Sequence, residues 1–398
     1  MLVCIAGKND IAVEGLMMAL KLQKEHGFDL CVVCNKTETG KNNWQRSLRW
    51  YAEKYRVREC ELQEIYGIED LVFLSLEYDS IIKINKFRSK RLYNIHYSFL
   101  PNYKGMYTSA IPLLNGEKSS GVTLHCIDSG IDTGNIIAQK EFEIGDQDTC
   151  RDLYFKYTKN AILLLYENLE KLVLDGNISG YAQPALNASY YSRKYLNYEN
   201  IVIDLRQVSV NIYNQLRAFN FREYQLPVVF DKKIITSQIT HIHSTEKYGT
   251  ILCENEIGCM IATIDYDLII YWDRFEQLMR ACQMGDLDLV INICTVKGHI
   301  NQVGENGWTP LMVATYNGQY EIAKYLIMNG ADISAVNYNG TNLLMYAKAS
   351  YAKTGDSRLF KLFYDLGLKM EQCDYADHDL KYYCQKEGIR KIGEIDII

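Results

Sequence analysis

The sequence is short of proline, of positive charge and of long apolar runs. Only 5 of its 398 residues are proline, which argues against long disordered linkers. The formal net charge is −6, and this disfavours nucleic acid as a partner, because nucleic-acid-binding proteins concentrate basic residues on one face. No stretch reaches the roughly 18 consecutive apolar residues of a membrane span, so we expect no membrane-embedded segment. Hydrophobic residues still make up 48% of the chain, as in ordinary globular domains.

The N-terminus also lacks the features of a secretion signal. Its first ten residues, MLVCIAGKND, do not run from charged to apolar to small residues. The 12 cysteines are therefore interpreted as reduced thiols in a cytoplasmic protein rather than as a disulfide framework. Cys31 and Cys34 have the CxxC spacing, but strand alternation places their sulfurs on opposite faces, so we do not expect a metal or redox pair.

Strand-like and helix-like segments alternate over the first 90 residues. Apolar runs at residues 2–7, 29–35, 68–76 and 92–96 are typical of buried strands, and the predicted helices cover residues 11–26, 44–55 and a stretch before residue 92. Short apolar strands separated by helices predict a mainly parallel, Rossmann-like α/β sheet. Ligands of such sheets bind beyond the carboxyl ends of the strands, so the turn at residues 7–10 faces the expected site.

The length of the chain predicts more than one domain. We expect a long amphipathic helix over residues 148–175, then a polar connection. Residues 201–272 contain a predicted helix, 208–219, followed by β-hairpins. Such a small β region cannot close a core of its own size, so we expect it to pack on a neighbouring subunit or on the first domain.

An internal repeat occupies the last third of the chain. Gly285-Asp-Leu-Asp-Leu-Val returns as Gly318-Gln-Tyr-Glu-Ile-Ala, and Gly307-Trp-Thr-Pro-Leu-Met returns as Gly340-Thr-Asn-Leu-Leu-Met, both after 33 residues. This period and the Gly-x-Thr-Pro-Leu pattern resemble ankyrin repeats. About four extra residues enter the third unit around residues 352–356. Each unit exposes an apolar face when alone, so stacking supplies the core.

The region that begins at Asn94 carries the most informative pattern. It reads NIHYSFLPNYKG and, further on, GVTLHCIDSGIDTGNII. Together these segments resemble the formyl-tetrahydrofolate-dependent formyltransferase family, whose signature is Asn-x-His, Ser-x-Leu-Pro-x-x-x-Gly and His-x-x-x-x-Gly-x-Asp-x-Gly. The matching residues are Asn94, His96, Ser98, Leu100, Pro101, Gly105, His125, Gly130, Asp132 and Gly134. The resemblance covers roughly residues 1–190 well and 200–265 loosely.

Formyl transfer suits the residue types at these positions. A neutral amine attacks the formyl carbon, so negative charge develops on oxygen and a proton must leave nitrogen. Asn94 and His96 lie two apart on one strand, share a face and are predicted to donate hydrogen bonds to that oxygen. The resemblance implies that Asp132 orients the histidine and relays the proton. His125 lies within an apolar run, and we interpret it as a core histidine.

The resemblance also implies a co-substrate, N(10)-formyltetrahydrofolate, and no metal. The family's pterin slot lies between the loop after the third strand and the segment before the catalytic aspartate. The cofactor residues predicted in this way are Leu76, Tyr78, Ser80, Gly105, Ile127 and Asp128. Backbone groups do much of the binding in this slot, so Tyr78 can equally be an ordinary helix-start residue.

Nucleotide-sugar formyltransferases are the relatives that fit best. They resemble this chain in SYYSRK, residues 189–194, and in QLRAFNFREYQLP, residues 215–227. The ankyrin extension resembles that of members acting on dTDP-linked 3-amino-3,6-dideoxyhexoses. The predicted acceptor is dTDP-3-amino-3,6-dideoxy-D-glucose, in O-antigen and other surface-polysaccharide synthesis. The alternative acceptors are dTDP-4-amino-4,6-dideoxyglucose and dTDP-3-amino-3,6-dideoxygalactose. An alternative of another class is a scaffold whose formyltransferase domain is vestigial.

The remaining predictions concern the acceptor and the organisation of the chain. Lys8, Asn9 and Arg193 are candidates for the pyrophosphate, and Phe221 and Tyr224 for the thymine; the alternatives are surface residues and core aromatics. Trp308 either belongs to a second ligand site or packs between repeats, and we expect the repeats to bind either a ligand or a protein. We expect a catalytic domain over residues 1–200, a homodimer-forming region over 201–272, and all-α ankyrin repeats over 273–398.

Overall fold

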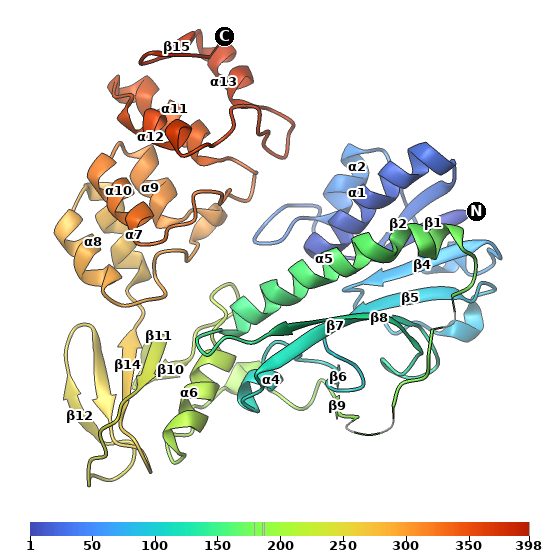
Figure 1. The fold of residues 1–398 in the computed structure, drawn as a ribbon, viewed down its shortest axis with the longest axis horizontal. Coiled ribbons are helices and arrows are strands. Elements are labelled where there is room, and N and C mark those ends of the chain that lie inside the picture. The colour runs from blue at the N-terminus through green and yellow to red at the C-terminus, as the bar shows by residue number, and fades with distance from the viewer. Residues whose placement is uncertain (179, 185, 187, 398) are drawn as a thin grey trace. The chain divides into compact units, whose positions relative to one another are not determined.

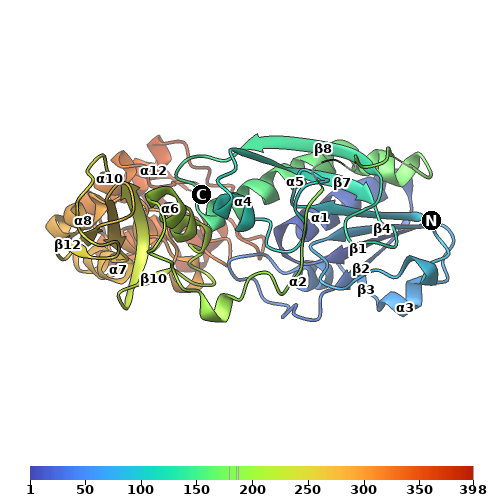
Figure 2. The same cartoon turned by 90° about the horizontal axis from the view of Figure 1, so that it is seen from below.

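A computed structural model describes residues 1–178, 180–184, 186 and 188–397 of the chain (Figure 1; Figure 2). The chain divides into two compact units. The first contains Met1–Asp204 and Val210–Gln225, and the second contains Leu205–Ser209 and the chain from Leu226 onward. Residue 398, the last of the predicted repeat domain, lies outside the described residues.

A seven-stranded sheet organises the first unit, in the order β3-β2-β1-β4-β5-β7-β8. The strands are β1 (Leu2–Gly7), β2 (Asp29–Cys34), β3 (Arg58–Glu59), β4 (Leu71–Leu76), β5 (Arg91–His96), β7 (Ser119–Cys126) and β8 (Ile136–Glu143). Pairing is parallel from β3 to β5 and antiparallel at β7 and β8. The predicted Rossmann-like α/β sheet is confirmed, with an antiparallel edge.

Two long helices, α1 (Asn9–His26) and α5 (Cys150–Leu174), cover one face of this sheet (Figure 1). Helix α5 begins at a capping box, in which the Thr149 hydroxyl accepts from the Asp152 N–H and the Asp152 carboxylate accepts from the Thr149 N–H. The apolar sides of both helices share one core with the strands. The opposite face buries a second core around Phe73, which contains Cys31. Cys34 packs against the α1 side, so the two sulfurs lie on opposite faces as predicted.

Shorter elements complete the first unit. They are α2 (Leu48–Lys54), α3 (Leu62–Ile65), α4 (Ile111–Leu114), α6 (Ser209–Ala218) and a two-stranded pair of β6 (Lys104–Gly105) with β9 (Tyr190–Tyr191). The helix predicted from residue 44 begins only at Leu48, because the Ser47 hydroxyl caps it. The helical stretch predicted before β5 was wrong: one 3₁₀ turn, Ile84–Lys86, occurs there, and Phe87 packs against Phe73.

An antiparallel sheet opens the second unit, in the order β10-β11-β14-β13-β12. Its strands are β10 (Val228–Val229), β11 (Lys232–Ile239), β12 (Ile251–Glu254), β13 (Gly258–Ile261) and β14 (Leu268–Trp272). Strand β14 leads almost directly into the first helix of the repeats, and the Arg274 N–H donates to Nε2 of the buried His299 at 3.1 Å. The hairpins and the repeats of one chain therefore form a single compact unit, an arrangement the sequence did not suggest.

Helical pairs form the repeats. The helices are α7 (Phe275–Met284), α8 (Leu287–Cys294), α9 (Pro310–Tyr316), α10 (Tyr320–Met328), α11 (Leu343–Thr354), α12 (Arg358–Asp365) and α13 (Leu380–Glu387), followed by β15 (Lys391–Ile392) and β16 (Ile395–Asp396). Thr309 caps α9, and Asn342 takes its place at α11. The extra residues of the third unit lengthen α11 to 12 residues against 7 in α9. Across the described residues, no helix combines the length and apolar composition that crossing a bilayer requires.

Candidate active site

Four polar side chains meet at the junction of β5 and β7. Asn94 and His96 lie at the carboxyl end of β5, and His125 lies on β7 directly opposite Asn94 in the antiparallel register. Asp132 comes from the turn between β7 and β8, where it adopts a left-handed backbone with φ of 54°. The sheet thus brings together the three residues predicted to carry the chemistry.

One carboxylate lies between two imidazoles. Asp132 Oδ2 is 3.4 Å from His96 Nδ1, and Asp132 Oδ1 is 3.6 Å from His125 Nε2. The Asn94 amide nitrogen is 3.0 Å from His125 Nε2. His125 is 2% exposed, so it is buried as expected. However, its interpretation as a purely structural histidine is incomplete, because it contacts both Asn94 and Asp132.

The hydrogen-bond partners constrain both histidine rings. His96 Nε2 lies 2.9 Å from the Tyr103 carbonyl, which only accepts, so Nε2 donates to it. Its Nδ1 faces the Asp132 carboxylate. His125 Nδ1 donates to the Cys126 carbonyl at 2.8 Å, and its Nε2 faces both the Asn94 amide nitrogen and the Asp132 carboxylate.

The surroundings keep Asp132 ionised. Burial raises its pKa, but the two histidines and the Gly105 N–H outweigh burial and hold the pKa well below the usual range of aspartate. The Gly105 N–H donates to Oδ2 at 2.9 Å. Asp132 is therefore a hydrogen-bond acceptor throughout the neutral pH range.

Two glycines of the signature permit the close backbone approaches around this carboxylate. A Cβ at Gly134 would lie 1.7 Å from the Cys126 carbonyl oxygen. Gly105 has φ of +90°, and a Cβ there would lie 2.3 Å from the Tyr191 carbonyl oxygen. Any side chain at either position would displace the turn or loop that contacts Asp132.

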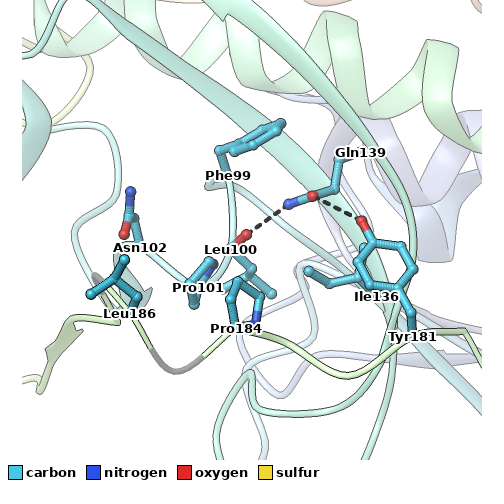
Figure 3. Close-up of a pocket in the computed structure, with 9 residues that line it drawn as sticks. All are labelled: Phe99, Leu100, Pro101, Asn102, Ile136, Gln139, Tyr181, Pro184 and Leu186. Atoms are coloured by element: carbon cyan, nitrogen blue, oxygen red, sulfur yellow. Dashed lines mark hydrogen bonds between the residues drawn. The ribbon is translucent and has the colours of Figure 1, made fainter.

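Hydrogen bonds hold the loop that follows His96. The Gln139 amide donates to the Leu100 carbonyl at 2.9 Å and accepts from the Tyr181 hydroxyl at 3.3 Å (Figure 3). Ser98 donates to the Asn102 carbonyl at 2.7 Å. A pocket of about 330 Å³ opens beside these contacts, and its lining is Phe99, Leu100, Pro101, Asn102, Ile136, Gln139, Tyr181, Pro184 and Leu186.

Known proteins are similar to this chain in sequence and in fold. A model of the formyl transferase family matches residues 80–169, and a model of ankyrin repeats in three copies matches residues 278–370. The sugar 3N-formyltransferase WlaRD, solved in the presence of dTDP and 5-N-formyl-tetrahydrofolate, is 42% identical, and the match covers 69% of this chain and 98% of WlaRD with a TM-score of 0.63. The N-formyltransferase of Helicobacter canadensis, solved with folinic acid and dTDP-3-aminofucose, matches at 42% identity over 69% of this chain and 100% of its own, with a TM-score of 0.63.

The chain belongs to the formyltransferase family. The GDP-perosamine N-formyltransferase of Brucella melitensis is 32% identical over 183 residues, which are 46% of this chain and 67% of that relative. Other relatives are matched only in part. This formyltransferase spans 38% of the bifunctional polymyxin resistance protein ArnA of Wigglesworthia glossinidia brevipalpis, at 35% identity, and 40% of the methionyl-tRNA formyltransferase of Borrelia duttonii, at 38% identity.

The residues predicted for the cofactor take two different positions in this formyltransferase. Tyr78 and Ile127 are both partly buried and pack against the core on the Phe73 face of the sheet. Leu76 is fully buried on the opposite face, so only its backbone is available.

The polar members of the predicted cofactor set have partners within the protein. Asp128 Oδ1 accepts from the Gly130 N–H at 3.0 Å and from the Thr133 hydroxyl at 2.7 Å. The Ser80 hydroxyl donates to its neighbour Asp79 at 3.2 Å. The Gly105 N–H donates to Asp132, so Gly105 belongs to the cluster around Asn94, His96 and Asp132.

The residues predicted for the acceptor differ in exposure. Phe221 is only 3% exposed, which favours its alternative role as a core aromatic, whereas Tyr224 is 64% exposed. Arg193 is exposed and Lys8 is partly buried. The Asn9 amide does not face outward as a phosphate ligand would, because it donates to the Glu77 carboxylate at 2.9 Å.

Glu77 and its surroundings are features that the sequence did not reveal. Glu77 follows β4 in a left-handed conformation with φ of 55°, and it accepts from Asn9 and from the Tyr154 hydroxyl, the latter at 2.9 Å. Trp44 packs beside them, with its ring 5.5 Å from Tyr154 and 5.3 Å from Phe221. These groups come from five separate segments, so no local pattern could have linked them.

Proposed function

We propose that this formyltransferase transfers the formyl group of N(10)-formyltetrahydrofolate to the amine of a dTDP-linked amino-dideoxyhexose. The observation that carries the proposal is the convergence of Asn94, His96 and Asp132 in a chain 42% identical to two solved sugar formyltransferases. Those two proteins were solved with dTDP or dTDP-3-aminofucose and with formylated folates. A 3-amino acceptor is thus favoured, and dTDP-3-amino-3,6-dideoxy-D-glucose remains our first choice.

Each residue of the cluster has a defined task in this reaction. The folate, when bound, supplies the formyl carbon, and Tyr78 and Ile127 are the side chains that we assign to its pterin slot. His96 places its Nδ1 beside Asp132 and is oriented by the Tyr103 carbonyl. Asn94 offers amide hydrogens to the developing negative charge. Asp132, ionised at neutral pH, orients His96 and relays the proton that the attacking amine must lose.

The alternatives differ in the acceptor or in the absence of turnover. The dTDP-3-aminofucose relative supports the galacto-configured acceptor as the nearest alternative, and dTDP-4-amino-4,6-dideoxyglucose follows. A panel of dTDP-aminohexoses with formyl-folate, assayed by folate release, ranks them by kcat/KM. A scaffold with a vestigial catalytic domain would show no turnover with any acceptor.

Two substitutions test the assignment of the residues. Asp132→Asn removes the negative charge and His96→Asn removes the imidazole, while each retains the approximate side-chain size. Both variants are expected to fold and to lose about 10²–10⁴-fold in kcat, because each removes a proton acceptor or a donor to developing charge. Near-normal turnover in either variant would refute the assignment.

Three further parts of the proposal concern the setting of the enzyme. We place its product in surface-polysaccharide synthesis and the enzyme in the cytoplasm, where nucleotide sugars are made. We also propose a homodimer formed through the hairpins of residues 201–272. Equilibrium sedimentation tests the dimer, and a monomer at micromolar concentration would contradict it.

A further inference from the structure

A segment between α5 and α6 runs along both loops of the catalytic cluster. We call residues 180–191 the strap; residues 185 and 187 within it lie outside the described part. At its start, Tyr181 exchanges two backbone hydrogen bonds with Ile136, of 2.8 and 2.9 Å. At its end, β9 pairs in parallel with β6 (Figure 1). The strap therefore spans the distance between the Asp132 turn and the loop after His96.

Gln183 holds the Asp132 turn. Its Nε2 donates to the Asp132 carbonyl at 2.9 Å and to the Gly134 carbonyl at 2.8 Å. Two carbonyls can only accept, so the amide has one possible orientation. Its Oε1 is then buried without a partner among the described residues, which is unfavourable. Both donors of the Gln183 amide are thus used on the Asp132 turn.

Ser189 holds the other loop. Its Oγ accepts from the Tyr103 N–H at 2.8 Å, and its carbonyl accepts from the Lys104 N–H at 2.9 Å. Two backbone groups of this loop contact the candidate catalytic pair. The Tyr103 carbonyl accepts from His96 Nε2, and the Gly105 N–H donates to Asp132 Oδ2. One strap thus sets partners for both members of the His96–Asp132 pair.

We propose that the strap is the positioning element of this pair, with Gln183 and Ser189 as positioning residues. Asp132 is a non-glycine residue in a left-handed conformation, and such a conformation persists only where its surroundings hold it. Without Gln183 the turn relaxes and the carboxylate leaves His96. Without the Ser189 hydroxyl the Tyr103 carbonyl shifts relative to His96 Nε2.

The first experiment observes the histidines without substrate. The chain has 7 histidines, so ¹H–¹⁵N correlation of the imidazole nitrogens resolves them. Gln183→Ala and Ser189→Ala are expected to shift the His96 signals, and Ser189→Thr, which keeps the hydroxyl, is expected to restore them. Gln23→Ala is the matched control, because this amide also donates to a backbone carbonyl, that of Phe28 at 2.8 Å, at the far end of α1. Unchanged His96 signals in both alanine variants would overturn the proposal.

The second experiment is kinetic and rests on the proposed function. Gln183→Ala and Ser189→Ala are expected to lower kcat by about 10- to 100-fold and to change either KM by less than about threefold, because misplacement harms the reacting geometry more than binding. Ser189→Thr and Gln23→Ala should retain wild-type kcat. A kcat within twofold of wild type for Gln183→Ala would contradict positioning.

The two experiments separate the possible failures. If the wild-type enzyme turns over no dTDP-amino sugar, the proposed function fails while the imidazole signals still decide the role of the strap. If Gln183→Ala does not fold, as judged by thermal unfolding, the pair Ser189→Ala and Ser189→Thr carries the decision. If Ser189→Ala and Ser189→Thr then lose kcat to the same extent, the result counts against the proposal.

Discussion

At the scale of single residues, Glu77 is a carboxyl group whose surroundings disfavour its ionised form. Burial raises its pKa to about 7, and the hydrogen bonds from Asn9 and Tyr154 offset burial only in part. Its hydrogen-bond partners are neutral groups, and the attraction of Lys8 lowers the pKa less than burial raises it. The carboxylate therefore destabilises the folded state wherever it is ionised.

This imbalance predicts a pH-dependent effect of Glu77→Gln. The unfolded chain ionises near pH 4.5 and the folded chain near pH 7, so the free energy of unfolding falls as pH rises between these values, by about 3 kcal/mol in all. Glutamine cannot ionise, so the variant should match the wild type near pH 4.5 and exceed its Tm at pH 8. Glu69→Gln, at an exposed position, should match the wild-type Tm at both pH values. A Tm difference that is equal at pH 5 and pH 8 would contradict the account.

At the scale of elements, the sequence predicted what local patterns determine. Apolar runs located β1, β2, β4 and β5, and helical spacing located α1 and α5, because burial of one face controls each pattern. The 33-residue period located the repeats for the same reason. The signature motifs then identified Asn94, His96 and Asp132 without any knowledge of the register.

Other features depended on contacts between distant segments. His125 joined the cluster because β7 pairs antiparallel with β5 and places it opposite Asn94. The strap and the Glu77 group depend on hydrogen bonds between residues about 50 to 80 positions apart. Side-chain types and their spacing along the chain do not indicate such pairings. The strap and the Glu77 group could therefore be recognised only in the folded structure.

The end of the repeat array offers a prediction about α11 and α13. Lys348 of α11 is 5% exposed, and its ammonium lies 2.6 Å from the Glu387 carboxylate of α13, which is partly open to solvent. Glu387→Gln leaves the buried charge unpaired and should lower the free energy of unfolding by about 1–3 kcal/mol, whereas Lys348→Met should be nearly neutral, because its chain fills the same space. Urea unfolding measures both.

An exposed ion pair supplies the control for this comparison. Asp365→Asn, which breaks the surface pair with Lys361, should cost less than about 0.5 kcal/mol. The interpretation fails if Lys348→Met proves more destabilising than Glu387→Gln, since the pair would then be worth more than the apolar packing that replaces it.

At the scale of the whole molecule, the candidate active site lies within one of the two compact units. The first unit contains Asn94, His96, His125 and Asp132 and the described residues of the strap. The second contains the repeats, whose most notable polar–aromatic group surrounds Trp308. Its ring lies 4.6 Å from Tyr346 and 5.3 Å from Tyr316, and the Lys353 ammonium lies 3.4 Å from the Tyr316 ring centre. Trp308 is only partly buried, so packing between repeats leaves part of its surface open.

A second ligand site at Trp308 stays a prediction, and the stoichiometry of binding tests it. Aromatic faces beside a cation suit a nucleobase joined to phosphates. Calorimetry with a dTDP-amino sugar should therefore give two sites per wild-type chain and one per Trp308→Ala chain, with the catalytic site retained. Tyr364→Ala, which removes an exposed ring of α12, should leave two sites. Unchanged stoichiometry and affinity in Trp308→Ala would instead assign this tryptophan to packing alone, since a ring that contacts ligand cannot be removed without loss of binding energy.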